Sequence, residues 1–197
     1  MDKFKLLVLD MDGVVNSDQL IHQWFDDKFK ELENDDNCYV NDELRLAVRK
    51  AFAEQFDHST ELIFPELAKY ITTICEKTNC YILWSSSWRR LEKYRKIEDA
   101  KDMFNRRGLP GDKLIGYTPQ FTRYDDGCRG AEIRSWIMNN ELGKVFRAAV
   151  VDDRIDAGFL QLKNACFFQT DEYYGITEKH VSDIIKYLNR GIRPTND

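Results

Sequence analysis

The chain has 197 residues, 43% of them hydrophobic and 13% aromatic, which is enough for one sizeable core with room for a small insert. Its 29 Lys and Arg against 34 Asp and Glu give a net charge of -5, which argues against a general nucleic-acid coat but leaves room for a local basic patch. The five cysteines lack C-x-x-C spacing, and no segment resembles a signal peptide or reaches the roughly 18 apolar residues of a membrane span, so we expect a soluble, cytoplasmic protein with reduced thiols.

Short apolar runs that alternate with helical patterns predict the fold. The runs expected to form buried strands are residues 4–9, 80–84, 113–117, 147–151 and 165–169. Pro65 opens one helical pattern, residues 129–142 contain another, and a third begins after Thr177 and stops at Gly191. Alternation of strand and helix is typical of a mostly parallel sheet with helices on both faces. We therefore predict one α/β, Rossmann-like domain over residues 1–197.

One stretch, residues 17–58, departs from this alternation. It contains two amphipathic helical patterns joined by a polar turn at 33–38. The apolar positions are Ile21, Trp24, Phe25, Phe29 and Leu32 in the first pattern and Leu44, Val48, Ala51 and Phe52 in the second. We predict a small helical, cap-like insert directly after the first strand.

Polar and charged residues follow the predicted strands where each strand ends. Asp10 and Asp12 end the first run, "SSSWR" (85–89) follows the second, Arg129 precedes a later helix, and "DDR" (152–154) follows the fourth. Because ligands gather at the carboxyl ends of parallel strands, we expect these groups to meet. Several carboxylates at one point repel unless a divalent cation lies among them, and oxygen ligands favour Mg²⁺ over zinc. A hydroxyl and a guanidinium beside such a site suit a phosphoryl group.

The order D-x-D-G, Ser at a strand end, a basic residue and D-D resembles the haloacid dehalogenase (HAD) superfamily of phosphohydrolases, from residue 4 to about 190. The segments "LDMDGVVN", "LWSSSWR", "GYTP", "RGAEIRSWI", "VVDDR" and "FQTDEYYGIT" resemble, more narrowly, the HAD domains associated with RNA repair. The "DDR" segment also resembles the phosphatase half of polynucleotide kinase-phosphatase. The resemblance implies a HAD-like fold and a Mg²⁺ cofactor.

The resemblance also implies roles for the acidic residues. Asp10 matches the nucleophile that takes the phosphoryl group, and Asp12 matches the acid that protonates the leaving oxygen and then activates water. Asp153 matches a magnesium ligand with Asp152 beside it, and Asp10 and the main-chain carbonyl of Asp12 complete the expected metal site. Asp156, one helical turn further on, is an additional candidate.

The expected phosphate-binding groups are a serine hydroxyl and a cation. Ser86 aligns best with the phosphate-binding position, with Ser85 as the alternative, and Arg129 stands where the family usually has Lys. Simpler interpretations stay open. The serines, Ser87 above all, could cap a helix, Arg129 could be a surface residue at a helix start, and the acids at 152–153 could form an N-cap pair.

A basic stretch directly after the serines bears on the substrate. Its members are Arg89, Arg90, Lys93, Arg95 and Lys96, to which Arg106 and Arg107 add. They could follow a nucleic-acid backbone, with Trp84 or Trp88 as a surface on which a base stacks. The alternative is a solvated helix face on which Glu92 and Lys96 form an ion pair.

These observations lead to a Mg²⁺-dependent phosphomonoesterase that works through an aspartyl-phosphate, with a nucleotide or a nucleic-acid end as the expected substrate. A small-molecule phosphatase, such as a 5'-nucleotidase or a sugar phosphatase, is the enzymatic alternative. A catalytically idle HAD-like binding module is the alternative from another class. The acids at 10, 12, 152 and 153 argue against the idle module.

Overall fold

A five-stranded sheet forms the centre of the molecule in the computed structural model, which describes residues 4–32, 42–56, 62–121, 128–139, 145–155 and 164–194. The strands are β1 (Phe4–Leu9), β2 (Tyr81–Trp84), β3 (Leu114–Tyr117), β4 (Val145–Asp152) and β5 (Ala165–Gln169). They pair in the order β3-β2-β1-β4-β5, and every pairing is parallel. Leu9 of β1 lies between Trp84 and Val151 of the neighbouring strands, so the carboxyl ends of the three central strands meet at one edge. The predicted parallel α/β fold is confirmed.

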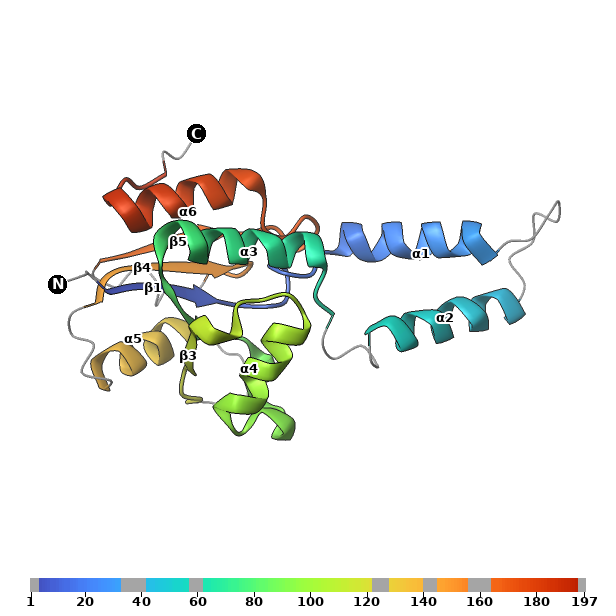
Figure 1. The fold of residues 1–197 in the computed structure, drawn as a ribbon, viewed down its shortest axis with the longest axis horizontal. Coiled ribbons are helices and arrows are strands. Elements are labelled where there is room, and N and C mark those ends of the chain that lie inside the picture. Colours follow the sequence, from blue (N-terminus) through green and yellow to red (C-terminus); the bar gives the residue numbers. More distant parts are fainter. Residues whose placement is uncertain are drawn as a thin grey trace.

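Helices cover both faces of the sheet (Figure 1). The described helices are α1 (Asp18–Leu32), α2 (Asp42–Phe56), α3 (Pro65–Thr78), α4 (Ile97–Arg106), α5 (Arg129–Asn139) and α6 (Glu178–Arg190). Leu7 and Leu9 of β1 enter the core beneath α3, α4 and α6, whereas Leu6 and Val8 enter the core beneath α5. This division follows from the alternation of side chains along a strand, and it explains why β1 is apolar at every position from 6 to 9.

The helix boundaries show the expected capping chemistry. Pro65 occupies the first turn of α3, where its missing N–H is not needed. Thr177 caps α6 through its hydroxyl, and Gly191 ends that helix with a φ of 77°, a left-handed conformation that suits glycine. These two predicted helices are confirmed, whereas α4 was not foreseen in the sequence.

The segment after β2 corrects one prediction. Instead of a continuous helix face, it forms two short 3-10 helices, η1 (Ser87–Arg90) and η2 (Glu92–Tyr94), with extended backbone at Leu91 between them. Glu92 therefore pairs with Arg95, at 3.4 Å, rather than with Lys96. Tyr94, the last residue of η2, lies in the core, where it is 2% exposed.

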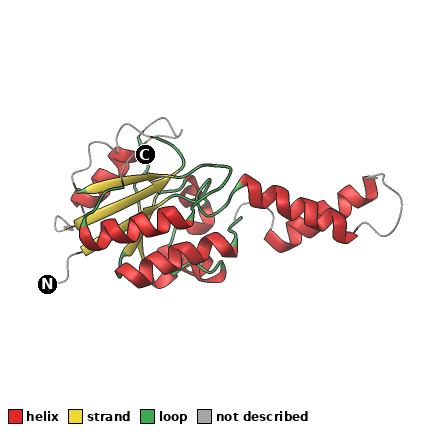
Figure 2. Ribbon diagram, turned by 90° about the horizontal axis from the view of Figure 1, so that it is seen from above, coloured by secondary structure: helices red, strands yellow, loops and turns green. Residues whose placement is uncertain are grey.

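Helices α1 and α2 extend from the carboxyl edge of the sheet as an arm of two adjacent helices (Figures 1 and 2). They pack on each other through Phe25 and Phe52, whose rings stack with centroids 4.9 Å apart. The base of the arm is fixed by backbone hydrogen bonds from Gln19 to Tyr173 and from Phe64 to Val15, of 2.9 and 3.0 Å. The two expected amphipathic helices are thus present, and the expected turn at 33–38 lies outside the described residues. Among the described residues, no helix combines the length and the apolar character that crossing a membrane requires.

Candidate active site

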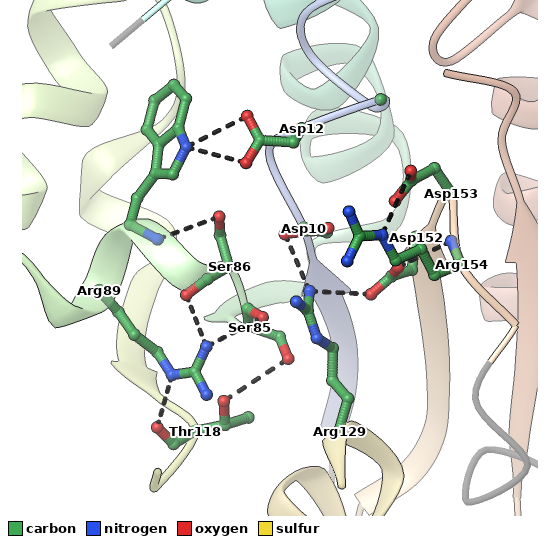
Figure 3. Close-up of polar contacts among 12 residues, drawn as sticks. Asp10, Asp12, Ser85, Ser86, Arg89, Thr118, Arg129, Asp152, Asp153 and Arg154 are labelled. Atoms are coloured by element: carbon green, nitrogen blue, oxygen red, sulfur yellow. Dashed lines mark hydrogen bonds and ion pairs between the residues drawn. The ribbon is translucent and has the colours of Figure 1, made fainter. Parts of the chain in front are cut away.

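Asp10 stands directly after β1, where it is 4% exposed. Its backbone N–H donates to the carbonyl of Val151, at 3.0 Å, so the β1–β4 ladder continues past the last strand residue and fixes the side chain at the sheet edge. Nη1 of Arg129 lies 2.9 Å from Oδ1 of Asp10 and 3.0 Å from Oδ2 of Asp152. The first residue of α5 thus supplies a positive charge to the acids at the ends of two neighbouring strands (Figure 3).

The single guanidinium of Arg129 does not offset the effect of burial on the pKa values of Asp10 and Asp152. Burial raises the pKa of the Asp10 carboxyl from 3.8 to about 6, although the charge of Arg129 opposes the rise. Burial, and then the negative charge of Asp10, raise the pKa of Asp152 to about 7. The site therefore favours additional positive charge beside these carboxyls.

Asp153 adds a third carboxylate to the same place. One oxygen from each of Asp10, Asp152 and Asp153 lies within 4.8 Å of the other two. Oδ1 of Asp10 is buried and has no aligned hydrogen bond, because the nearby Arg129 nitrogen makes an ion-pair contact of poor hydrogen-bond geometry. Three carboxylates and one guanidinium leave a formal charge of -2 when all are ionised, which matches a divalent cation. All-oxygen donors of this kind fit Mg²⁺.

Gly13 allows Asp153 to approach the loop after β1. The glycine has a φ of +65°, and an added Cβ would lie 2.7 Å from Cβ of Asp153, closer than atoms can approach. The hydroxyl of buried Thr170, which follows β5, donates to the Gly13 carbonyl at 2.7 Å and holds the loop. Sequence reasoning noted the glycine without this reason and missed Thr170, although its place directly after a strand is a signal of the kind used for the acids.

The two candidate serines point in different directions (Figure 3). The Ser85 hydroxyl lies 3.5 Å from that of Thr118, whereas the Ser86 side chain lies on the side of Asp10 and Asp12. Ser86 is also the N-cap of η1, because its Oγ accepts the N–H of Trp88 at 3.4 Å. Of the serines that could cap a helix, Ser86 is the cap, and Ser87 is the first residue of η1. Capping uses a lone pair of the hydroxyl and leaves its hydrogen available for a phosphate oxygen.

Arg89 has a structural position that the sequence prediction did not give it. It is 7% exposed, so it does not belong to a surface patch. Its guanidinium donates to the carbonyls of Ser85, Ser86 and Thr118 and forms a 2.6 Å ion pair with buried Glu132 of α5. A fork of fixed N–H donors suits this task, because it can bind several carbonyls and a carboxylate together. Arg89 therefore joins the serine loop to the helix that carries Arg129.

Asp12 lies on the other side of Asp10 and is exposed. Its carboxylate accepts the indole N–H of Trp88 at 3.0 and 3.1 Å and the amide of Asn16 at 3.1 Å. The side chain is therefore not part of the acidic group formed by the other three aspartates. Trp84, the other candidate for base stacking, is fully buried and offers no surface.

The structure thus brings together most of the residues selected from the sequence. The acids at 10, 152 and 153, the serine loop and Arg129 lie around the carboxyl edge of β1 (Figure 3). Asp156 lies outside the described residues, and Arg89 belongs to the interior. Arg129 contacts two of the acids, which excludes the interpretation of a surface residue at a helix start.

Comparison with known proteins agrees with the class of protein that this fold and site define, a HAD-type domain. The model of the family described as "HAD domain in Swiss Army Knife RNA repair proteins" matches residues 6–181. The chain belongs to this family.

Two solved structures have a low similarity to the chain. A crystal structure of the Legionella pneumophila effector Ceg4 with an N-terminal yeast Hog1p sequence has 13% identity and a TM-score of 0.47, covering 98% of this chain and 96% of that one. Beta-phosphoglucomutase from Clostridium difficile has 13% identity and a TM-score of 0.39, covering 96% of this chain and 100% of that one. A search of the curated proteins finds no match to the chain.

Proposed function

We propose that the protein is a Mg²⁺-dependent phosphomonoesterase that works through an aspartyl-phosphate on Asp10. The observation that carries the proposal is the meeting of three carboxylates with Arg129 at the end of β1, where one buried oxygen of Asp10 has no aligned hydrogen bond. A carboxylate so placed keeps its lone pairs directed at the sheet edge, with Arg129 as an ion-pair partner, and can act as a nucleophile.

In the proposed reaction Asp10 attacks the phosphorus of a bound monoester. The bond from phosphorus to the leaving oxygen breaks, and Asp12 gives its proton to that oxygen. Water then attacks the phosphorus of the aspartyl-phosphate, Asp12 takes the proton of the water, and the products are inorganic phosphate and the original Asp10 carboxylate. The Ser86 hydroxyl and the Arg129 guanidinium bind the phosphoryl oxygens throughout.

Mg²⁺ would be held by Asp10, Asp152 and Asp153, and by the main-chain carbonyl of Asp12. When bound, it supplies positive charge against the phosphoryl oxygens and the acids. Burial of Asp10 and Asp152 supports this role, because it raises the pKa of both carboxyls and so favours any ligand that compensates their charge. Arg129 contacts one oxygen of each of these two acids. Its guanidinium therefore does not occupy the other oxygen of either carboxylate.

For the substrate we propose a nucleotide or a phosphorylated nucleic-acid end. Support comes from the family, whose described members are RNA repair proteins. The exposed position of Asp12 is also consistent with a large leaving group, because the acid that would protonate it faces solvent. Exposed cations after β2, among them Lys93, Arg95 and Lys96, could bind the backbone of such a substrate.

A phosphatase screen in Mg²⁺ tests the proposal. Small monophosphates are compared with RNA and DNA oligonucleotides that carry a 3'- or 5'-phosphate, using the wild-type protein and Asp10→Asn. We expect hydrolysis by the wild type, a loss of at least about a thousandfold in Asp10→Asn, and no hydrolysis after chelation of Mg²⁺. Asp99→Asn, which alters an exposed acid in the first turn of α4, is the matched control and should retain activity.

The outcomes separate the alternatives. Equal activity in wild type and Asp10→Asn would remove Asp10 as the nucleophile. A preference for free metabolites over every oligonucleotide would favour a small-molecule phosphatase. A folded wild-type protein that hydrolyses none of the substrates would leave the catalytically idle binding module.

A further inference from the structure

The contact between Trp88 and Asp12 joins two segments that are 76 residues apart in the sequence. The indole N–H reaches both carboxylate oxygens, at 3.0 and 3.1 Å, and Asn16 donates to one of them at 3.1 Å. The Asn16 side chain is itself held in place, because its amide oxygen Oδ1 accepts a hydrogen bond from the Gly13 backbone N–H at 2.8 Å. The carboxylate therefore has a defined direction although Asp12 is exposed.

The chemistry of the donors makes this arrangement specific. An indole N–H can only donate, and it carries no charge, so it orients a carboxylate without forming the strong ion pair that a lysine or arginine would form. Asp12 thus keeps an exposed position in which it can exchange a proton with water or with a substrate oxygen. A cation at this point would compete with that exchange.

The position of Trp88 also links Asp12 to the serine loop. Trp88 lies in η1, its backbone N–H donates to the Ser86 hydroxyl, and its ring packs against the main core. One residue therefore contacts both the candidate phosphate-binding hydroxyl and the candidate acid, and its partly buried ring restricts its movement. In Figure 3 the Asp12 carboxylate lies on the Ser86 side of the site, away from Asp152 and Asp153.

We propose that Trp88 is the positioning residue for the acid step, and that its indole N–H directs the Asp12 carboxyl toward the leaving oxygen of a bound phosphate ester. This inference rests on the function proposed above. It predicts that loss of the indole N–H matters only when the leaving oxygen needs a proton. Nitrophenolate departs as a stable anion, whereas an aliphatic alkoxide must be protonated as it leaves.

The test compares kcat/KM for two esters of similar size, para-nitrophenyl phosphate and benzyl phosphate. The value of kcat/KM reports the first irreversible step, in which the leaving group departs, and so isolates the acid role of Asp12 from its role toward water. For Trp88→Phe we expect a loss of about tenfold on benzyl phosphate and less than about twofold on para-nitrophenyl phosphate, because the N–H is removed and the ring is kept. Asp12→Asn should show the same selectivity with a larger loss on benzyl phosphate.

Trp136→Phe is the matched control, because it removes the same N–H from an indole that packs over Gly116 of β3. It should change neither kcat/KM. A second measurement follows the indole N–H signals by nuclear magnetic resonance. The Trp88 signal, identified by its absence in Trp88→Phe, should move in Asp12→Asn.

Each failure has its own signature. An equal loss on both esters in Trp88→Phe would assign the residue a merely structural role and overturn the inference, as would no loss on either. A Trp88 signal that stays in place in Asp12→Asn would show that the contact does not exist. A wild-type protein inactive on both esters and on the phosphorylated oligonucleotides would overturn the proposed function and the inference with it, even if the signal moves and the contact is real.

Discussion

The two sides of the β1 carboxyl end hold their acids in contrasting ways. Toward β4, Asp10 and Asp152 are 4% and 1% exposed and share the guanidinium of Arg129. Toward β2, Asp12 is exposed, and among the described residues its carboxylate accepts hydrogen bonds only from the neutral N–H groups of Trp88 and Asn16. The D-x-D motif thus separates two acids that are two residues apart into a buried, ionic environment and an exposed, neutral one.

This difference matches what the two acids are proposed to do. A nucleophile and metal ligands benefit from low exposure, because charges act more strongly on one another where water is excluded. A residue that gives and takes protons must meet water and the leaving group, so it benefits from exposure and from partners that do not hold its charge. The contrast in exposure therefore gives a physical reason why Asp10 is proposed as the nucleophile and Asp12 as the acid and base.

The largest change should come from the buried ion pair beneath the β2 side. Arg89→Met leaves Glu132 buried without its cation and frees the carbonyls of the serine loop, so we expect the free energy of unfolding to fall by about 3–5 kcal/mol. Urea denaturation measures it. Arg95→Met is the control, because Arg95 and Glu92 are 77% and 83% exposed, and it should cost less than about 0.5 kcal/mol. A loss of unfolding free energy in Arg89→Met no larger than in Arg95→Met would mean that the buried Arg89–Glu132 ion pair does not stabilise this side of the site.

Gly13→Ala should disturb the β4 side next. The added methyl meets Asp153 at 2.7 Å and the residue must keep a φ of +65°, so we expect a loss of about 1–3 kcal/mol in stability. Because Asp153 must shift, the rise in melting temperature that we expect Mg²⁺ to give the wild type should shrink. Thermal unfolding with and without Mg²⁺ measures both effects. Gly108→Ala is the control, since it also has a positive φ, of 77°, but its added Cβ would meet only ordinary contact, at 3.8 Å. An unchanged response to Mg²⁺ in Gly13→Ala would exclude Asp153 as a ligand.

Much of this arrangement could be predicted from the sequence, because it depends on local patterns. Apolar runs identified the strands, and acids directly after two of them had to meet once β1 and β4 were neighbours in a parallel sheet. Thr177 and Gly191 identified the ends of α6 in the same way.

The remaining features depend on partners that are distant in the sequence. Nothing near Arg89 indicates that it is buried, because its partner Glu132 lies 43 residues away. The Trp88 contact with Asp12 also joins distant segments, 76 residues apart, and sequence reasoning considered Trp88 as a stacking surface. Helix α4 was missed because its buried face consists of only Ala100, Met103 and Phe104 among charged neighbours.

The pH dependence of the free energy of unfolding should show a smaller effect, which tests the buried side of the site through Asp152. The folded pKa of Asp152, about 7, lies above its ordinary 3.8, so the folded protein binds this proton more tightly than the unfolded chain does. The free energy of unfolding of the metal-free protein should therefore fall as pH rises from about 4 to about 7, and Asp152→Asn should remove part of that fall. At about pH 8 we expect the variant to be more stable than the wild type by about 1 kcal/mol, with no advantage near pH 4.

Chemical denaturation of the metal-free protein across this pH range measures the Asp152 effect. Mg²⁺ should reverse the order at high pH, because it stabilises the wild type through a ligand that the variant lacks. Asp12→Asn is the comparison from the exposed side, and its effect on the pH dependence of stability should be smaller than that of Asp152→Asn, because the charge of Asp12 raises the pKa of Asp10 less than burial does. The same change in pH dependence in both variants would contradict the division of the site into a buried and an exposed half.

The smallest effect on global stability is expected in the α1–α2 arm. Phe52 is partly buried and stacks on Phe25, and its ring centroid lies 5.0 Å from that of Trp24. Phe52→Ala should therefore speed hydrogen exchange in α1 and α2 while lowering the global free energy of unfolding by less than about 1 kcal/mol. Phe104→Ala, at a fully buried site in α4, should cost about 3–5 kcal/mol. Comparable losses of global unfolding free energy in the two variants would mean that the arm unfolds together with the sheet. The base of α1, which is hydrogen-bonded to Tyr173, would then transmit changes in the arm to the carboxyl edge where the acids lie.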